Sequence, residues 1–237
     1  MKKNILVWDL PLRLFHWTFA GSLTVALAIG FLVDDDSPVF QLHTLFGLVA
    51  AFALVIRVLL GVVGSRHNRF SAMPLRPGAV VTYFLGTLTG KARRYIGHNP
   101  GCALAAMVMF TLVPLLIVSG AGWLGEIGEE LHEGLAIALL ATIAAHLAGI
   151  IWHTLRHKEA IGMSMVTGRK KGPEEEGLAN ARPGWAIVML AVGIAWVWAL
   201  FSSHDPRAET VRIPLTGIVL DIGEYDGGEY TDDDDDD

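Results

Sequence analysis

The sequence predicts an all-α integral membrane protein with a four-helix bundle, a fifth, peripheral transmembrane helix and an acidic C-terminal tail. Of its 237 residues, 52% are hydrophobic and 18% are charged, and the mean hydropathy of +0.46 is higher than that of soluble domains. Five apolar runs are each long enough to cross a bilayer as a helix, namely 10–33, 40–63, 101–124, 131–155 and 184–201.

The first apolar run, 10–33, differs from a secretory signal peptide. It is longer than the roughly 7–15 apolar residues of a signal-peptide core, and the DDDSP that follows it offers no small-residue cleavage site. We therefore expect it to be retained as the first span.

The polar segments between the later spans differ in character. The loop 64–100 carries six basic residues and no acidic one, and its inner part, 80–88, is expected to form a short interfacial helix. The fifth span is rich in Trp but lacks His, so we expect it to lie outside the bundle. The predicted organisation is a core at 1–160, a connector at 161–183, the fifth helix at 184–201 and the tail at 202–237.

The basic residues predict the orientation of the chain in the membrane. Of 18 Lys and Arg residues, three lie near the N-terminus, six in the loop 64–100 and six between the fourth and fifth spans, all on one side. The positive-inside rule places that side in the cytoplasm. We expect a multi-pass protein of the bacterial inner membrane, with a cytoplasmic N-terminus and a periplasmic C-terminus.

The fourth span carries His132, His146 and His153 in an otherwise apolar stretch. An ionisable ring at membrane depth predicts a functional site. His132 and His146 are 14 residues apart, which places them within about 40° of one helix face and roughly 21 Å apart along the axis. This spacing suits two stacked cofactors, and haem is the cofactor that imidazole commonly holds inside helical bundles. Because Cys102 is the single cysteine and no Cys-x-x-Cys-His is present, the haem would be b-type.

Topology pairs these histidines with two others. His43 lies near the external entrance of the second span and is expected to meet His132. His16, in the first span, is expected to meet His146, since the two centres should be about 21 Å apart. His153 remains the alternative to His146. The predicted axial ligands of two b haems are thus His16, His43, His132 and His146.

Arg57 lies deep in the second span, 14 residues after His43 and on the same helix face. A buried guanidinium requires an anion, and a haem propionate would supply one. The alternative is that Arg57 extends its charged end to the nearer membrane interface.

Several short motifs carry a resemblance to a known family. The segments VWDLPLRLFHW, GSRHNRF, GHNPG, LHE and VTGRKK, spread in order over residues 7–171, resemble the bacterial cytochrome b561 and nickel-iron hydrogenase cytochrome b family. The resemblance implies a four-helix di-haem core with ligands on helices one, two and four, and the matching positions are His16, His43, His132 and His146.

The resemblance also implies a quinone site. In the related formate dehydrogenase cytochrome subunits, an Asn-x-Gly before the third helix lies beside the cytoplasmic haem where menaquinone binds, and Asn99 and Gly101 match it here. His98 would supply a proton relay. The alternative is that Asn99 caps the third helix and Gly101 eases the backbone.

Two haems with two imidazole ligands each have no open iron position, so their predicted chemistry is one-electron transfer. The leading hypothesis is electron transfer between the quinone pool and a periplasmic c-type cytochrome or redox enzyme subunit. The alternatives are a superoxide oxidase that reduces quinone, a membrane anchor of a hydrogenase-like complex, and a His-lined metal transporter. An acidic external face argues against attraction of superoxide, and the absence of an inverted repeat argues against a transporter.

The tail from 202 onward holds 12 acidic residues against Arg207 and Arg212. One interpretation is a disordered, solvated or non-native end. The other is that the tail attracts a basic cytochrome, with a short strand or docking element at 212–222. Membrane lipid is an expected partner, nucleic acid is not, and a homodimer is left open.

Overall fold

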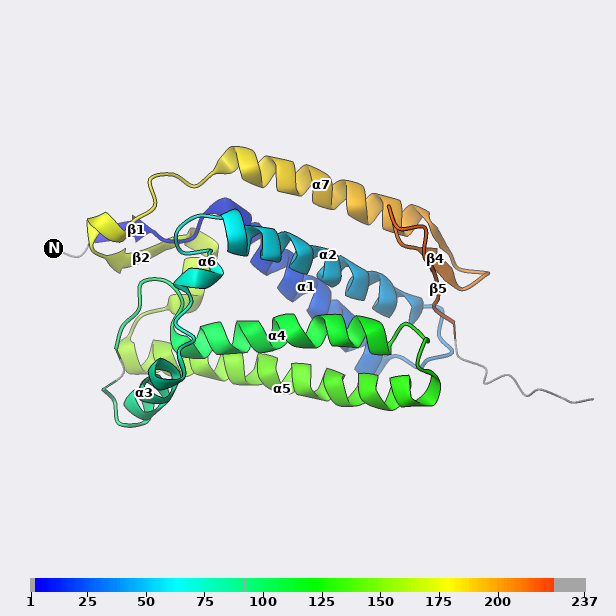
Figure 1. The fold of residues 1–237 in the computed structure, drawn as a ribbon, viewed down its shortest axis with the longest axis horizontal. Helices are drawn as coiled ribbons and strands as arrows, with labels where there is room; N and C mark the ends of the chain where they lie inside the picture. Colours follow the sequence, from blue (N-terminus) through cyan, green and yellow to red (C-terminus); the bar gives the residue numbers. More distant parts are fainter. Residues whose placement is uncertain (1–2, 92, 224–237) are drawn as a thin grey trace, which may run out of the picture.

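The computed structural model describes residues 3–91 and 93–223. Five of its helices are long and apolar enough to span a membrane, which confirms the predicted fold class (Figure 1). They are α1 (Leu10–Leu32), α2 (Gln41–Val63), α4 (Pro100–Ser119), α5 (Gly125–His157) and α7 (Pro183–Ser202).

The bundle consists of two helical hairpins. Helix α1 packs along α2, and α4 packs along α5, while contact between the hairpins runs mainly through α2 and α4. Helix α5 makes little backbone contact with α1 or α2. In the described part of α5, Leu139 is the only large hydrophobic side chain that is fully buried. The backbone of α5 is therefore farther from α1 and α2 than from α4.

Helix α7 lies outside this bundle, along α1 and α2 and on the side away from α4 and α5 (Figure 1). Most of its side chains remain exposed, as expected for a peripheral span in contact with lipid.

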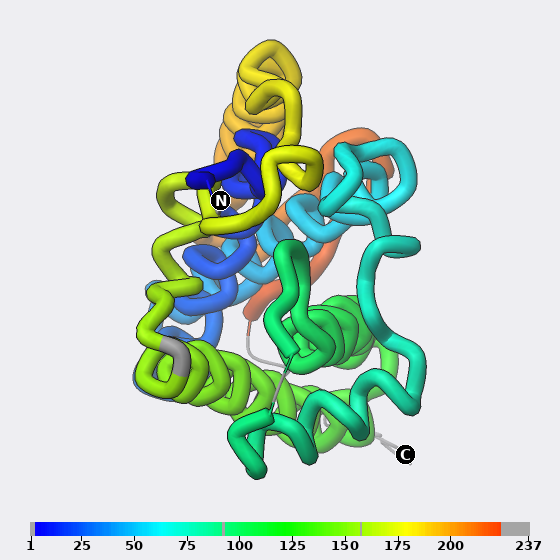
Figure 2. Tube along the Cα trace, turned by 90° about the vertical axis from the view of Figure 1, so that its left-hand side faces the viewer, coloured from blue at the N-terminus to red at the C-terminus, as the bar shows by residue number. Residues whose placement is uncertain are grey.

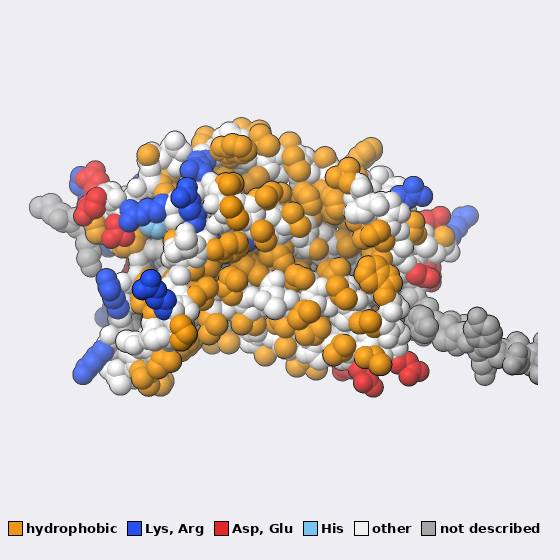
Figure 3. All heavy atoms as spheres, viewed as in Figure 1, with side chains coloured by type: hydrophobic (Ala, Val, Ile, Leu, Met, Phe, Trp, Pro, Cys, Tyr) orange, Lys and Arg blue, Asp and Glu red, His pale blue; other side chains and the backbone are white. Residues whose placement is uncertain are grey.

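The two ends of the bundle differ in charge. We call the end that holds the N-terminus, the loop 64–99 and the connector 158–182 the basic end, and the end that holds the loops 33–40 and 120–124 the acidic end. Figure 3 shows Lys and Arg gathered mostly at the basic end, with a broad apolar band between the two ends. Such a band is what a membrane-spanning bundle presents to lipid.

Short elements cover the basic end (Figure 2). Helix α3 (Pro77–Leu88) occupies the position where a short helix was predicted. Strand β1 (Lys3–Leu6) pairs antiparallel with β2 (Arg169–Gly172), a pairing that the sequence did not predict. The backbone N–H groups of Val7 and Trp8 both donate to the carbonyl of Gly168, at 2.8 and 3.0 Å. These bonds fix the start of α1 to the segment that follows α5.

The remaining short elements of the basic end lie in the loop 64–99 and in the connector 158–182. They are the 3₁₀ turns η1 (Phe70–Ala72), η2 (Ile161–Met163) and η3 (Glu174–Glu176), and the single-turn helix α6 (Ser164–Thr167).

A three-stranded antiparallel sheet covers part of the acidic end, with the order β3 (His204–Asp205), β4 (Thr210–Arg212) and β5 (Val219–Asp221). Its apolar face is buried against α2 and the end of α7, in a cluster of Leu45, Leu48, Val49, Leu200, Val211, Leu220 and Ile222. The short strand expected within 212–222 is thus present as β5. The acidic run 224–237 lies outside the described residues.

A seven-residue repeat divides the bundle interior into three layers. Seven residues advance a helix by about 10.5 Å and turn it by nearly two full turns, so residues seven apart share a face. The acidic layer holds Gly30, His43, Gly120 and His132. The middle layer holds Leu23, Ala50, Val113 and Leu139, which belong to one buried cluster. The basic layer holds His16, Arg57 and His146.

We predict that the sheet contributes to stability through its buried face. Leu220 is 6% exposed and Leu215, in the loop of the same sheet, is 101% exposed. Leu220→Ala should cost about 2–4 kcal/mol of the sheet's packing free energy, and Leu215→Ala less than about 0.5 kcal/mol. The effect would be measured as the change in the thermal unfolding midpoint and in the rate at which a protease cleaves the segment that follows Ser203. Equal values for the two variants would contradict the prediction.

Candidate functional site

His43 and His132 face each other in the acidic layer. Their ring centroids are 5.8 Å apart, and the ring planes make an angle of 67°. Metal–nitrogen bonds of about 2 Å on opposite sides of one ion put two imidazole centres roughly 6 Å apart. The two rings therefore lie at the separation expected of axial ligands to a shared metal.

Hydrogen bonds fix both rings of this pair. Nδ1 of His43 lies 2.9 Å from the carbonyl oxygen of Ala26, and Nδ1 of His132 lies 3.0 Å from that of Leu116. Since a carbonyl only accepts, each Nδ1 must carry the proton, which leaves Nε2 with a free lone pair. This is the arrangement of metal-binding histidines, in which the second nitrogen is held by a backbone carbonyl.

Two glycines make these hydrogen bonds possible. A Cβ at Gly30 would lie 2.9 Å from Nδ1 of His43, and a Cβ at Gly120 would lie 2.7 Å from Nδ1 of His132. Each glycine follows the accepting carbonyl by four residues, so a side chain there would cover the carbonyl. The carbonyl of Leu116 accepts from the N–H of Gly120 at 2.9 Å as well as from His132.

His16 and His146 form the corresponding pair in the basic layer. They lie close enough for electrostatic interaction, and the Nδ1 atom of each is buried without a hydrogen-bond partner in the described structure. The side chains of Arg13 and Trp17 hold α1 in place, because both donate to the backbone oxygen of Met165, at 3.3 and 3.1 Å.

His153 lies one seven-residue step beyond His146 toward the basic end and is half-buried. His16 interacts electrostatically with His146. The choice between His146 and His153 as the partner of His16 stays a prediction.

Arg57 is buried in the basic layer and is only 1% exposed. Its two terminal nitrogens have no hydrogen-bond partner among the described residues. The guanidinium carbon lies 4.6 Å from the ring centroid of Phe70, 5.5 Å from that of Phe110 and 5.9 Å from that of Phe15. A Cβ at Gly61 would overlap the Phe70 ring, so this glycine lets Phe70 cover the charge. The side chain of Arg57 therefore ends inside the bundle and does not extend to the membrane interface, which was the alternative considered from the sequence.

These observations fit a planar group held between α5 and the first hairpin. The paired imidazoles offer two nitrogens, and the unpartnered donors of Arg57 offer a counter-charge for a carboxylate. Haem has this combination of a flat ring, an iron with two axial positions and anionic propionates.

His98, Asn99 and Gly101 lie where α4 begins, at the basic end. Asn99 is the N-cap of α4, and its side-chain oxygen accepts from the N–H of Cys102 at 2.8 Å. A Cβ at Gly101 would lie 3.1 Å from the ring of Tyr83. The capping role considered for Asn99 is therefore present, and the quinone role of these residues stays a prediction.

The ring of His98 packs against Trp8, with centroids 4.8 Å apart. Burial, followed by the positive charge of Arg57, lowers the pKa of His98 from its usual 6.5 to about 3. The ring is therefore neutral at physiological pH.

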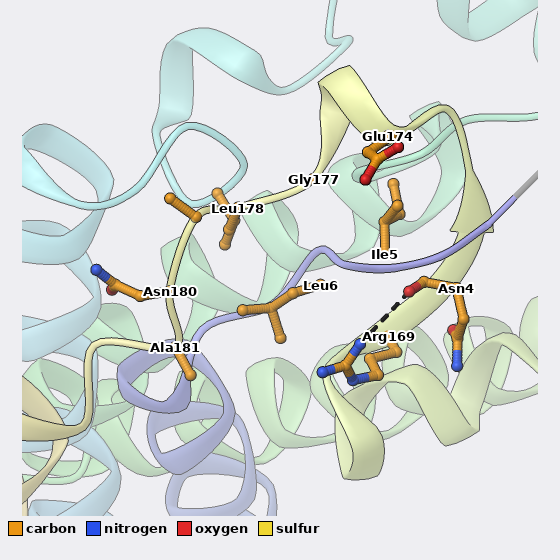
Figure 4. Close-up of a pocket in the computed structure, with 10 residues that line it drawn as sticks. Asn4, Ile5, Leu6, Arg169, Glu174, Gly177, Leu178, Asn180 and Ala181 are labelled. Atoms are coloured by element: carbon orange, nitrogen blue, oxygen red, sulfur yellow. Dashed lines mark hydrogen bonds between the residues drawn. The ribbon is translucent and has the colours of Figure 1, made fainter.

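A polar hollow of about 480 Å³ opens elsewhere on the basic end (Figure 4). It lies between β1 and the connector, and Arg169 crosses it to donate to the carbonyl of Asn4 at 3.4 Å. None of the four paired histidines lines it, so we do not assign it to the cofactor site.

The fold and the paired histidines define a class, that of helical membrane proteins with facing histidines inside the bundle. The comparison with known families specifies it further. The family described as prokaryotic cytochrome b561 matches residues 7–168, and the chain belongs to that family. It is a multi-pass membrane protein that carries b-type haem and transfers electrons.

Curated relatives carry a common description, "Probable Ni/Fe-hydrogenase B-type cytochrome subunit". The protein of Bradyrhizobium diazoefficiens is 22% identical over 215 residues, covering 72% of this chain and 87% of the relative. That of Rhizobium leguminosarum bv. viciae is 25% identical over 222 residues, covering 74% and 92%. That of Rhodobacter capsulatus is 24% identical over 144 residues, covering 52% and 55%. No solved structure matches the chain significantly.

Sequence reasoning missed Gly30 and Gly120, which shape the acidic layer. The signal that would have found Gly30 is the seven-residue series 16, 23, 30, which runs beside the series 57, 50, 43 of the antiparallel second span.

We predict that both glycines are needed for haem binding in the acidic layer. A methyl group at Gly30 or Gly120 would push the ring of His43 or His132 off its carbonyl, because contacts under 3.0 Å force a shift. Gly30→Ala and Gly120→Ala should each lower the haem content per chain, measured as pyridine haemochrome. Gly21→Ala and Gly47→Ala, which have nothing within 4 Å of the added carbon, are the controls. Unchanged haem in the first two variants would contradict this interpretation.

We also predict that His98 makes the protein sensitive to acid. Because its folded pKa lies below the usual value, the unfolded chain binds a proton that the folded chain does not, and stability falls as the pH drops from 6.5 toward 3. The melting temperature of His98→Gln should therefore decline less steeply between about pH 6.5 and 4.5 than that of the native protein. Parallel declines would show that His98 is not buried in its neutral form.

Proposed function

We propose that the chain holds two b haems and carries electrons across the bacterial inner membrane, between quinone at the cytoplasmic, basic end and a redox partner at the periplasmic, acidic end. The observation that carries this proposal is the facing pair His43 and His132, each with its Nδ1 proton on a helix carbonyl. The second pair, His16 and His146, lies two layers away, about 21 Å by helix rise.

In the acidic layer, the carbonyls of Ala26 and Leu116 hold the Nδ1 protons and orient both rings. A hydrogen bond to Nδ1 also makes Nε2 a stronger ligand. When bound, haem would supply reversible one-electron chemistry, and His43 and His132 would hold its iron. The residues of this layer therefore orient the cofactor and take no part in bond making with a substrate.

In the basic layer, His16 and His146 would be the axial ligands and Arg57 would pair with a propionate. The rings of Phe15, Phe70 and Phe110 surround the guanidinium and keep water from it. An Arg–carboxylate pair in such surroundings is charge-assisted and only weakly screened.

Quinone would bind near the basic layer, beside His98, Asn99 and Gly101. Support comes from the electrostatic interaction of His98 with both Arg57 and His146. Asn99 uses its side-chain oxygen to cap α4, which leaves its amide N–H₂ as a donor for a quinone oxygen. Because its pKa is lowered to about 3, His98 would not keep a proton released when quinol is oxidised, and its neutral ring would instead accept a hydrogen bond from a quinol O–H.

The periplasmic partner would be a redox enzyme subunit or a c-type cytochrome. The hydrogenase description of the relatives favours an enzyme subunit. The acidic tail, which would attract a basic partner by long-range charge, falls largely outside the described residues. The acidic charge at this end disfavours the superoxide oxidase alternative, since superoxide is an anion.

Haem content tests the ligand assignment. His132→Ala and His146→Ala should each lose about half of the bound haem, because each removes one of two axial ligands at one of two sites. Arg57→Leu should lower the occupancy of the basic layer. His153→Ala is the control and should keep all the haem, as measured by pyridine haemochrome and redox titration. Full haem in His146→Ala with loss in His153→Ala would overturn the pairing.

Electron transfer is then measured in sealed vesicles, with a quinol in the membrane and a c-type cytochrome outside. Either His→Ala variant should abolish transfer. A chain ending at Gly223 keeps the described sheet and should slow transfer at low salt only, because screening removes attraction between exposed charges at high salt. Equal rates at every salt concentration would show that the tail does not recruit the acceptor.

A further inference from the structure

A shallow apolar groove runs between α1 and α7 near their basic ends. It has a volume of about 360 Å³ and is lined by Leu14 and Trp17 of α1 and by Ala186, Ile187 and Leu190 of α7. Arg13 is the one charged side chain among the described residues that line it.

The groove opens toward the lipid phase. Trp17 is 52% exposed and Ile187 is 67% exposed, and both belong to membrane-spanning helices.

The two ends of α7 are held differently. At the acidic end Leu200 is fully buried against α2 and the sheet. At the basic end the backbone N–H of Leu10 donates to the carbonyl of Ala181 at 2.9 Å, which joins the chain just before α7 to the start of α1. The groove begins next to this bond, at Leu10 and Pro183.

Arg13 lines the groove and Arg182 is adjacent in the chain to a residue that lines it, and neither has an acidic partner among the described residues. The guanidinium of Arg13 donates to the backbone oxygens of Met165 and Val166. Arg182 comes directly before Pro183, a residue that lines the groove. Among the described residues, no carboxylate lies within 4 Å of either guanidinium. Neither charge is therefore neutralised by a carboxylate of the described chain.

We propose that this groove binds one anionic glycerophospholipid. One acyl chain lies along Leu14, Ala186 and Leu190, where it covers apolar surface, and the phosphate lies between Arg13 and Arg182. Basic residues at the membrane surface favour anionic headgroups by about 1 kcal/mol each, and an indole such as that of Trp17 is typical of the headgroup level.

The site lies partly outside the region that matches the cytochrome family, since α7 begins at residue 183 and the match ends at 168. The bound lipid would join α7 to α1 at the end where side-chain packing between them is incomplete. It does not depend on the haem number or on the quinone site, so failure of either proposal leaves the other unaffected.

Native mass spectrometry of the purified full chain tests the proposal, with phosphatidylglycerol and phosphatidylcholine of identical acyl chains added after delipidation. The native protein should retain phosphatidylglycerol about 30-fold better, the factor that about 1 kcal/mol for each of two basic residues gives. Arg182→Gln and Arg13→Gln should each reduce this preference about fivefold, and Ala186→Phe, which fills the groove, should reduce retention of both lipids.

Matched controls separate the site from general charge and hydrophobicity. Arg76→Gln removes a charge at the same end outside the groove, and Val188→Phe adds a ring to a face of α7 that does not line it; both should bind as the native protein does. Arg13→Lys keeps the charge and should retain most of the preference. Equal retention of the two lipids, native-like retention by Arg182→Gln and Ala186→Phe, or displacement of the lipid by a quinone analogue would each overturn the proposal.

Discussion

The structure depends on a double demand placed on imidazole inside an apolar bundle. A ligand histidine must present Nε2 to the iron while its other nitrogen finds an acceptor, because an unpartnered donor in this environment is costly. Helix carbonyls supply the acceptor, but they are normally covered by the side chain four residues later. For the carbonyls that bind His43 and His132, the residue four positions later is a glycine, Gly30 and Gly120 respectively. Because glycine has no side chain, the carbonyl is open to Nδ1 while Nε2 stays available for the iron.

The two layers that contain histidine meet this demand in different ways. In the acidic layer the rings are fixed by the protein alone, through Ala26 and Leu116. In the basic layer the Nδ1 atoms of His16 and His146 and the ends of Arg57 lack protein partners. The polar groups of the basic layer are therefore left for non-protein partners, whereas the histidines of the acidic layer are already fixed by the protein.

Much of this arrangement follows from the sequence because helix geometry is regular. The spans, the fold class and the common face of His132 and His146 depend only on apolar length and on 100° per residue. The pairing of β1 with β2 could not be predicted, because it joins residues far apart in the chain through backbone bonds that carry little sequence signal. The roles of Gly30 and Gly120 were missed for a similar reason, since they depend on the height at which helices from different parts of the chain meet.

The segments beyond the family match support the ends of the helices that carry His16 and His43, the first two of the proposed ligands. Strand β2 begins at residue 169 and pairs with β1, directly before the helix that carries His16. At the other end, Gln41 lies two residues before His43 and is 4% exposed; its side chain is bound by His204, Pro206 and Glu209. Because a ligand near a helix end is displaced when that end frays, these additions hold His16 and His43 at the heights their partners on α5 require.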